Sequence, residues 1–242
     1  ATVTVTIPAG QQSVTVPVVT NDDAIAGESP ETINGTISGV TGGNGATIAT
    51  ATALGTITDN DGTPTVSIGA PKTVPEGTAV DNTITLSGAS AVAVSVTLTT
   101  AGTAPSPTVP ADLGQQQYST DGGTTFIDVP ANGIISIPAG VLNVIVRTPT
   151  VNDTLGEPVE SFGVTLSAPV GVTISPTAAS VTNTIEASDP VTVSIANGTS
   201  VVEGNPSVFT ITLSNLSTQA TTVTFNTSDG SAVAPGDYTA QA

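Results

Sequence analysis

The segment VAVSVTL, residues 92–98, places an apolar side chain at every second position. Successive side chains of a β-strand point to opposite faces, so this period of two predicts a strand with one buried face. The same alternation occurs in residues 2–7, 13–18, 134–137, 143–146, 191–195, 209–213 and 222–225. Clusters of Gly, Pro, Asn and Asp separate these segments, and no stretch has a helical period. The pattern predicts an all-β fold.

The composition favours a folded chain with an aliphatic core. The 242 residues are 38% hydrophobic but include only two Tyr, four Phe and no Trp. The core must therefore consist mainly of β-branched side chains on pleated surfaces. Seven or so strands in about 120 residues, arranged as two facing sheets, predict immunoglobulin-like β-sandwich domains.

The charge is strongly one-sided. Nineteen acids face only Lys72 and Arg147, which gives a net charge of −17. Such a chain repels phosphate backbones and anionic lipids, so we expect neither a nucleic-acid partner nor direct membrane insertion. Where acids cluster they need countercharge, and a divalent cation supplies it compactly. The alternative is a solvated acidic surface that aids solubility.

The chain contains neither Cys nor His. Disulfides and thiolate metal sites are excluded, and the commonest catalytic base and zinc ligand is missing. Carboxylate pairs such as Asp59 and Asp61 would need an apolar cleft beside them to act as a hydrolase, and the sequence indicates none. We therefore expect a protein that is not an enzyme. The lack of Cys is typical of bacterial proteins that are secreted or displayed at the cell surface.

Internal similarity divides the chain into three parts. TVSI at 65–68 and VPEG at 74–77 return 127 residues later as TVSI and VVEG. In the other direction, IPAG at 7–10 matches IPAG at 137–140, and ND and GE at 21–22 and 27–28 match 152–153 and 156–157. We interpret residues 63–189 as a complete domain, 1–62 as the C-terminal half of a similar domain, and 190–242 as its N-terminal half.

The two half-domains read as one continuous domain when residue 242 is followed by residue 1. We therefore hypothesise that the chain is one period of a two-domain tandem array within a longer polypeptide. A sandwich is roughly 30 to 40 Å long, so half-domains at its opposite ends cannot complete each other within one chain. Each is expected to pair with a neighbouring repeat or copy, end to end.

The joined half-domains resemble a Calx-beta domain. Its opening half is resembled by VVEG at 201–204, FTITLS at 209–214, TSDGSA at 227–232 and GDY at 236–238. Its closing half is resembled by IPAG at 7–10, by NDD at 21–23 with Glu28 and Glu31, and by GTITDND at 55–61. Together these motifs cover nearly all of the joined domain in the family's order.

The resemblance implies a sandwich that binds calcium at one end through acids in the loops at a domain junction. Carried over by position, the candidate ligands are Glu203, Asp237, Asp22, Asp23, Glu28, Asp59 and Asp61. The middle domain retains Glu76, Asp153, Glu157, Glu160 and Asp189. Clustered carboxylates suit Ca²⁺, which takes six to eight oxygen ligands. For each single acid the alternative is a turn-forming or exposed residue.

The middle domain departs from the family pattern at two places. Gln117 precedes Tyr118 where the family has Asp, and IEASD at 185–189 replaces the triple-acid ending, with Glu186 as a possible substitute. We expect the calcium site here to be weaker, to hold fewer ions, or to be lost. Residues 118–126 look like an insertion seen in large bacterial repeat adhesins, and they predict a hairpin.

Asp61 and Asp189 stand one to three residues before the next predicted domain, so an ion bound there would lie where two sandwiches meet. The sequence therefore predicts a structural, calcium-rigidified extender repeat of an extracellular fibre or adhesin. One alternative is a calcium-dependent adhesive module whose loops bind glycan or protein. Another is a subunit of a self-assembling extracellular filament joined by strand complementation.

Overall fold

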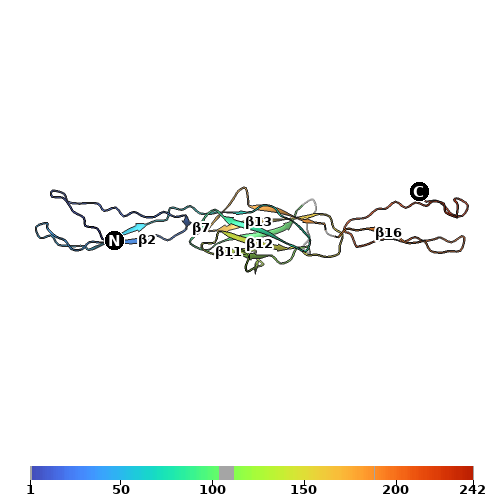
Figure 1. The fold of residues 1–242 in the computed structure, drawn as a ribbon, viewed down its shortest axis with the longest axis horizontal. Coiled ribbons are helices and arrows are strands. Elements are labelled where there is room, and N and C mark those ends of the chain that lie inside the picture. The colour runs from blue at the N-terminus through green and yellow to red at the C-terminus, as the bar shows by residue number, and fades with distance from the viewer. Residues whose placement is uncertain (1, 104–111, 188, 242) are drawn as a thin grey trace.

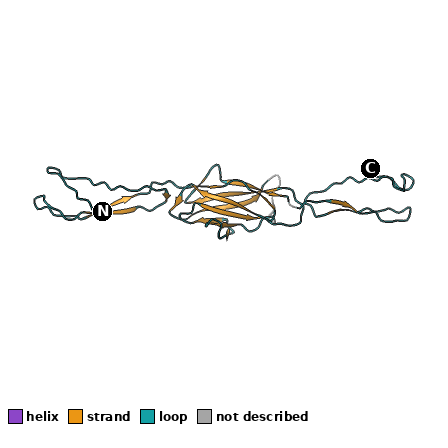
Figure 2. Ribbon diagram, in the orientation of Figure 1, coloured by secondary structure: helices purple, strands orange, loops and turns teal. Residues whose placement is uncertain are grey.

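The computed structural model describes residues 2–103, 112–187 and 189–241. Within these ranges the protein is all-β and contains no helix (Figure 2). Among the described residues there is accordingly no helix long and apolar enough to cross a membrane. A β-sandwich occupies the middle of an elongated molecule, and one long arm extends from each end (Figure 1).

The sandwich consists of two sheets that enclose one core. The six-stranded sheet has the order β10-β9-β12-β6-β4-β14. These strands are Ile127–Asp128, Gln117–Ser119, Asn143–Pro149, Ala79–Leu86, Thr65–Ile68 and Thr173–Ile174. The five-stranded sheet has the order β11-β8-β13-β15-β5. Its strands are Ile134–Ile137, Val94–Gly102, Glu160–Val170, Ser180–Glu186 and Thr73–Pro75.

Most neighbouring strands of the sandwich are antiparallel, and the halves of the domain interlock. Strand β12 pairs with β6, and β13 pairs with β8, each joining a late strand to an early one. The two exceptions to antiparallel pairing are the short edge contacts of β14 with β4 and of β5 with β15. Neither half of the domain could form its sheets without the other.

The core is aliphatic, as the composition predicted. Every second residue of β6 is buried, which matches the period of a strand with one face inward. The largest fully buried apolar side chains are Phe162, Ile84, Ile135, Ile137, Val66, Val80, Val96, Val144, Val146 and Val164. Full burial of one such side chain stabilises a fold by about 1.5–3 kcal/mol, so these residues dominate the stability of the sandwich.

One polar pair lies inside this core. Asn82 and Asn183 exchange two amide hydrogen bonds of 3.1 and 2.9 Å between the two sheets. The backbone N–H of Lys72 donates a third bond, of 3.0 Å, to the Asn183 carbonyl. Both side chains are almost fully buried, and these bonds satisfy groups that would otherwise be costly to desolvate.

The N-terminal arm, residues 2–61, and the C-terminal arm, residues 190–241, are thin. The first contains the antiparallel pair β2 and β3, Glu31–Thr36 and Thr52–Ile57. The second contains β16 and β17, Val193–Ile195 and Ile211–Leu213. Apart from Ala26, no hydrophobic side chain in the described part of either arm is buried. Each arm therefore exposes Val, Ile and Leu side chains, and the C-terminal arm also exposes Phe209.

Five of the eight predicted strands are confirmed, at 92–98, 134–137, 143–146, 191–195 and 209–213. The hairpin predicted at 118–126 is also confirmed, because β9 and β10 pair around it. The predictions of strands at 2–7, 13–18 and 222–225 are wrong for this chain. These three segments lie in the arms, where no neighbouring strand is available to complete a ladder.

The arms meet the sandwich at two similar joints. At the first, β1 (Ile25–Ala26) pairs in parallel with β7 (Ala89–Ser90). At the second, Gly156 and Ser217 form a parallel bridge. The eleven sandwich strands lie between Thr65 and Glu186. The division into one complete domain and two halves of another remains a prediction.

Candidate calcium-binding site

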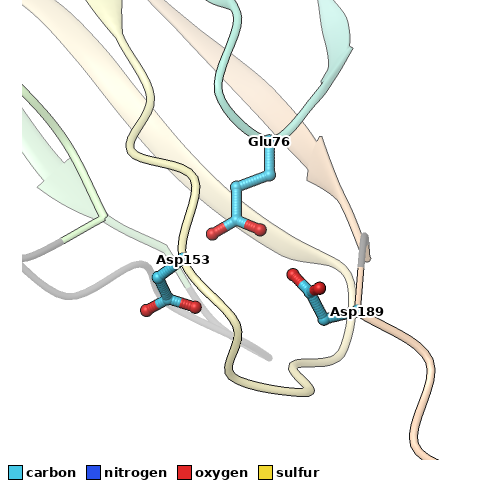
Figure 3. A group of neighbouring side chains, drawn as sticks. All are labelled: Glu76, Asp153 and Asp189. Carbon is cyan, nitrogen blue, oxygen red and sulfur yellow. The ribbon is translucent and has the colours of Figure 1, made fainter. Parts of the chain in front are cut away.

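Two carboxylate triads lie at the end of the sandwich that faces the C-terminal arm. The first consists of Glu76, Asp153 and Asp189, whose side chains converge from three separate segments (Figure 3). The second consists of Asp112, Glu157 and Glu160. Within each triad, one oxygen from every carboxylate lies within 4.8 Å of the others.

Local turns place the first triad. Glu76 directly follows β5, and Gly77 then turns the chain with a φ of +78°, in the left-handed region that favours glycine. A Cβ at Gly77 would come within 2.8 Å of the Asn152 Cβ, so glycine also lets the next acidic loop approach. In that loop, the Asp153 carboxylate accepts a hydrogen bond of 2.6 Å from the Leu155 N–H.

The second triad is the more enclosed of the two. Asp112 is buried, and Glu157 and Glu160 are half-buried. Burial, and then the neighbouring Asp112 carboxylate, raise the pKa of Glu160 to about 7. Burial also raises the pKa of Glu157, with Asp112 as the next cause. Placing charged carboxylates this close together without a cation is therefore unfavourable at neutral pH.

Basic side chains cannot neutralise both triads. Arg147 forms a bidentate ion pair with Asp81, with N–O distances of 2.7 and 2.8 Å. Lys72 is the only other lysine or arginine in the sequence. Glu76 of the first triad and all three acids of the second triad line a common pocket, together with Glu186. A bound cation or a proton on Glu160 would relieve the repulsion among these acids.

The donor set suits calcium. All six groups offer hard carboxylate oxygens, and the chain has no imidazole or thiolate to favour zinc. Six carboxylates, together with backbone carbonyls and water, could supply the six to eight ligands that Ca²⁺ takes. Glu76, Asp153, Asp189, Asp112, Glu157 and Glu160 are the residues that would hold it.

Sequence reasoning missed Asp112. It compared Asp237 with Gln117, but Gln117 lies in the β9–β10 hairpin, where its amide donates a hydrogen bond to Asp128. The usable signal was the match of PAD at 110–112 to PGD at 235–237, which the inserted residues before Tyr118 obscured. The middle domain therefore has an acid for this position. The weaker affinity expected there remains a prediction.

A separate group of acids lies at the base of the N-terminal arm, away from the two triads. The Asp59 carboxylate accepts hydrogen bonds from the backbone N–H groups of Asp61, Gly27 and Glu28, at 2.8, 2.7 and 3.1 Å. These bonds, that from Asp61 first, lower the pKa of Asp59. A further bond of 3.1 Å runs from the Asn60 amide to Asp22. The loops that carry the predicted ligands are thus held together.

Repulsion acts within this second group as well. The Asp23 carboxylate is the main cause of the raised pKa of Glu28. Burial, followed by Asp59 and Asp22, raises the pKa of Asp61. The structure therefore brings the predicted ligands Asp22, Asp23, Glu28, Asp59 and Asp61 into electrostatic contact.

The structure does not bring Glu203 and Asp237 to these five acids. Both lie on the C-terminal arm, which projects from the opposite end of the molecule (Figure 1). Their local settings are nevertheless formed. Gly204 follows Glu203 with a φ of +88°, as Gly77 follows Glu76, and the Asp237 carboxylate accepts a hydrogen bond of 2.8 Å from Val233.

Both acidic groups lie beside a joint. At the C-terminal joint, Glu157 and Asp189 line an open pocket of about 480 Å³ together with Ser217 and Gln219 of the arm. The Gly156 N–H donates to the Leu216 carbonyl at 2.7 Å, next to the same acids. At the N-terminal joint the Ala91 N–H donates to the Ala26 carbonyl at 2.9 Å, two residues before Glu28. Carboxylates and inter-unit backbone contacts thus recur together.

No family model and no curated protein matches the chain. Among solved structures, it is similar to the apo-form CBD1 domain of Calx, with 17% identity, a TM-score of 0.39, and coverage of 53% of this chain and 100% of that one. It is also similar to CBD12 from CALX1.2 (18% identity, TM-score 0.38, 50% of this chain, 44% of that one). A third similar structure is the calcium binding domain CBD12 of CALX1.1, with 20% identity, a TM-score of 0.37, and coverage of 50% of this chain and 43% of that one. The argument for a site therefore rests on the residues of this chain.

Proposed function

We propose that this chain is a calcium-dependent structural repeat, in which ions bound at the ends of consecutive sandwiches hold those sandwiches in line. The observation that supports this most directly is the pocket at the C-terminal joint. Its walls combine the acids Glu157 and Asp189 of the sandwich with Ser217 and Gln219 of the next unit. An ion held by these acids would act on the joint itself.

The short connection explains how binding would stiffen the molecule. Strand β15 ends at Glu186 and β16 begins at Val193, so few residues separate the sandwich from the arm. Asp189 belongs to this connection, whereas Glu76 and Asp153 belong to loops of the sandwich. Calcium would tie the connection to the sandwich. Without it, the like charges would push the three segments apart.

The magnitude is sufficient to matter. At a free calcium concentration of ten times Kd, binding adds about 1.4 kcal/mol to the stability of the bound state. Extracellular calcium modules bind in the range of about 10⁻⁴ to 10⁻³ M, which suits a joint assembled from separate loops. We therefore place the chain outside the cell, as a mechanical element of a bacterial fibre or adhesin rather than a catalyst.

The test is calcium-dependent thermal stability of the full chain. Calcium should raise the melting temperature of the wild type, and excess chelator should reverse the rise. The double variant Glu76→Gln, Asp189→Asn should lose most of this response, because it removes two of the three carboxylates of one triad. Asp128→Asn changes an acid in the hairpin instead, and it should respond like the wild type.

Two results would contradict the proposal. One is a wild type whose melting is the same in calcium and in chelator. The other is an equal loss of response in Asp128→Asn, which would indicate a general effect of charge rather than a site.

A further inference from the structure

We propose that the N-terminal arm of one copy and the C-terminal arm of a second copy close together into a sandwich, joining copies of this chain head to tail. The inference goes beyond the proposed function, because it rests on strand pairing and apolar burial and requires no ion. The central sandwich provides the internal standard against which each arm can be compared.

The C-terminal arm repeats the first half of the central sandwich in structure as well as in sequence. The β16–β17 ladder pairs Val193 with Leu213 and Ile195 with Ile211. The β4–β6 ladder has the same pairs 127 residues earlier, Val66 with Leu86 and Ile68 with Ile84. A side-chain bond is repeated too: Thr65 N–H donates to Ser87 Oγ, and Thr192 N–H donates to Ser214 Oγ, both at 2.9 Å.

The N-terminal arm repeats the second half. The β2–β3 ladder runs from the pair Glu31 with Ile57 to the pair Thr36 with Thr52. The β13–β15 ladder runs over equally many pairs, from Glu160 with Ile185 to Thr165 with Ser180. The IPAG turn is also repeated, because Gly10 and Gly140 have φ values of +82° and +76°. Each arm is thus folded as half of a sandwich.

Positions that are buried in the sandwich are exposed in the arms. Val144 and Val146 of β12 are 0% exposed, and the matching Val14 and Val16 are 44% and 52% exposed. In the same way, Ile84 is 0% exposed and its match Ile211 is 41% exposed. The exposed apolar side chains of each arm therefore occupy positions that face the core in a complete sandwich, but the other half of that sandwich is not there to cover them.

The strand pairings within the sandwich indicate which residues of one arm would lie opposite which residues of the other. Val144 lies opposite Ile84, and Ile135 lies opposite Val96. The equivalent pairs between the arms are Val14 with Ile211, and Val5 with Val223. Because the arms project from opposite ends of the structure (Figure 1), they cannot pair with each other within these 242 residues, and a second copy can supply the missing partner. Such a contact does not close on itself, so it propagates as an open chain.

A compensating difference indicates that the arms fit each other. Asn82 and Asn183, the buried amide pair that bridges the sheets, correspond to Phe209 and Gly55 in the arms. Phe209 is 46% exposed beside Phe225, with ring centroids 5.6 Å apart. A large ring facing a residue without a side chain replaces two matched amides. Either arm would pair poorly with an Asn-bearing half.

The same union would bring Glu203 and Asp237 to the acids at the base of the N-terminal arm. Their equivalents in the sandwich, Glu76 and Asp112, already lie in the two carboxylate triads. A partner copy would thus bring together all the ligands that the sequence predicts for the joined half-domains.

The experiment caps each end of the full chain separately. Val5→Asp disables the N-terminal arm and Val223→Asp the C-terminal arm, and a buried charge should weaken association at least about a hundredfold. By sedimentation in calcium, the wild type should form oligomers, and each variant alone should be monomeric. An equimolar mixture should give a dimer, because one intact pair of arms remains. Thr6→Asp and Asn226→Asp, aligned with exposed Ser136 and Thr99, should behave as wild type.

A second experiment exchanges the compensating pair. Phe209→Asn or Gly55→Asn alone should weaken association about tenfold or more, because a polar amide is buried without its partner. The double variant should recover association, because it recreates the pair of the central sandwich. Melting of that sandwich, whose residues are unchanged, confirms folding throughout.

The outcomes separate this proposal from the calcium proposal. A wild type that stays monomeric, or a mixture that yields no dimer, overturns head-to-tail assembly. A double variant that associates no more tightly than either single variant also overturns it. Dimers that form equally in calcium and in chelator support assembly and count against a role for calcium at this joint.

Discussion

At the scale of single residues, glycine controls how closely the C-terminal arm approaches the sandwich. A Cβ at Gly156 would overlap the Val191 side chain and lie 3.0 Å from the Asp189 carbonyl. We expect Gly156→Ala to force the joint open at a cost of about 1–3 kcal/mol. The central sandwich should keep its melting temperature, while X-ray scattering should show a broader range of particle shapes. Gly62→Ala is the matched control, because no atom lies near that position.

The buried Asn82 and Asn183 permit a second prediction at this scale. Asn82→Phe or Asn183→Gly alone should destabilise the sandwich by about 1–3 kcal/mol, because each leaves the remaining amide unsatisfied. The double variant, which carries the combination found in the arms, should cost clearly less than the sum of the single changes. Urea unfolding measures all three. Simple additivity would argue that the Phe209–Gly55 difference is not a compensating pair.

At the scale of strands and loops, Glu160 at the start of β13 links stability to pH. Burial and the Asp112 carboxylate raise its pKa to about 7 in the folded protein, from an ordinary value near 4.5. The folded state therefore binds this proton more tightly than the unfolded state. Calcium-free protein should lose stability as pH rises from about 4.5 to about 7, with no further loss above that range.

Comparison with Glu160→Gln isolates this effect from the other carboxylates. In chelator, the melting temperature of the wild type relative to that of the variant should fall between pH 5 and pH 8. Calcium at pH 8 should reverse the fall, because the ion replaces the proton as countercharge. A difference that is constant with pH would show that Glu160 has an ordinary pKa.

The strands also show how far the sequence alone leads. Alternation in residues 92–98 and 134–137 predicted β8 and β11 because each has a buried face and a partner in the same domain. The same alternation in 13–18 predicted a strand wrongly, because periodicity reports which face is apolar but cannot supply a neighbour. Strand β6 was not predicted, because the polar Asn82 interrupts its inward-facing row of Val80, Ile84 and Leu86.

The candidate site was predictable in part. Glu76, Asp153 and Asp189 were recognised from the repeat, and the structure brings them together. Asp112 was not, because inserted residues separate it from Tyr118 and hide the match of PAD at 110–112 to PGD at 235–237. The separation of Glu203 and Asp237 from the acids of the N-terminal arm depends on which halves share a sandwich, which is a property of the assembly.

At the scale of the whole molecule, we propose a row of sandwiches with acids gathered at the joints between them. The acids around Asp59 and Asp61 lie at the joint with the N-terminal arm, and the two triads lie at the joint with the C-terminal arm. Within each group the like charges repel one another, and bound cations would relieve that repulsion. Stiffness would then follow the calcium concentration, and the exposed arms would set where copies join.

The most direct test of calcium-stiffened joints is small-angle X-ray scattering on the chain that carries both Val5→Asp and Val223→Asp, so that assembly does not contribute. We predict a larger maximum dimension and a narrower range of shapes in calcium than in excess chelator. Scattering curves that superimpose in the two conditions would contradict the account, and would leave the acids as a solvated surface.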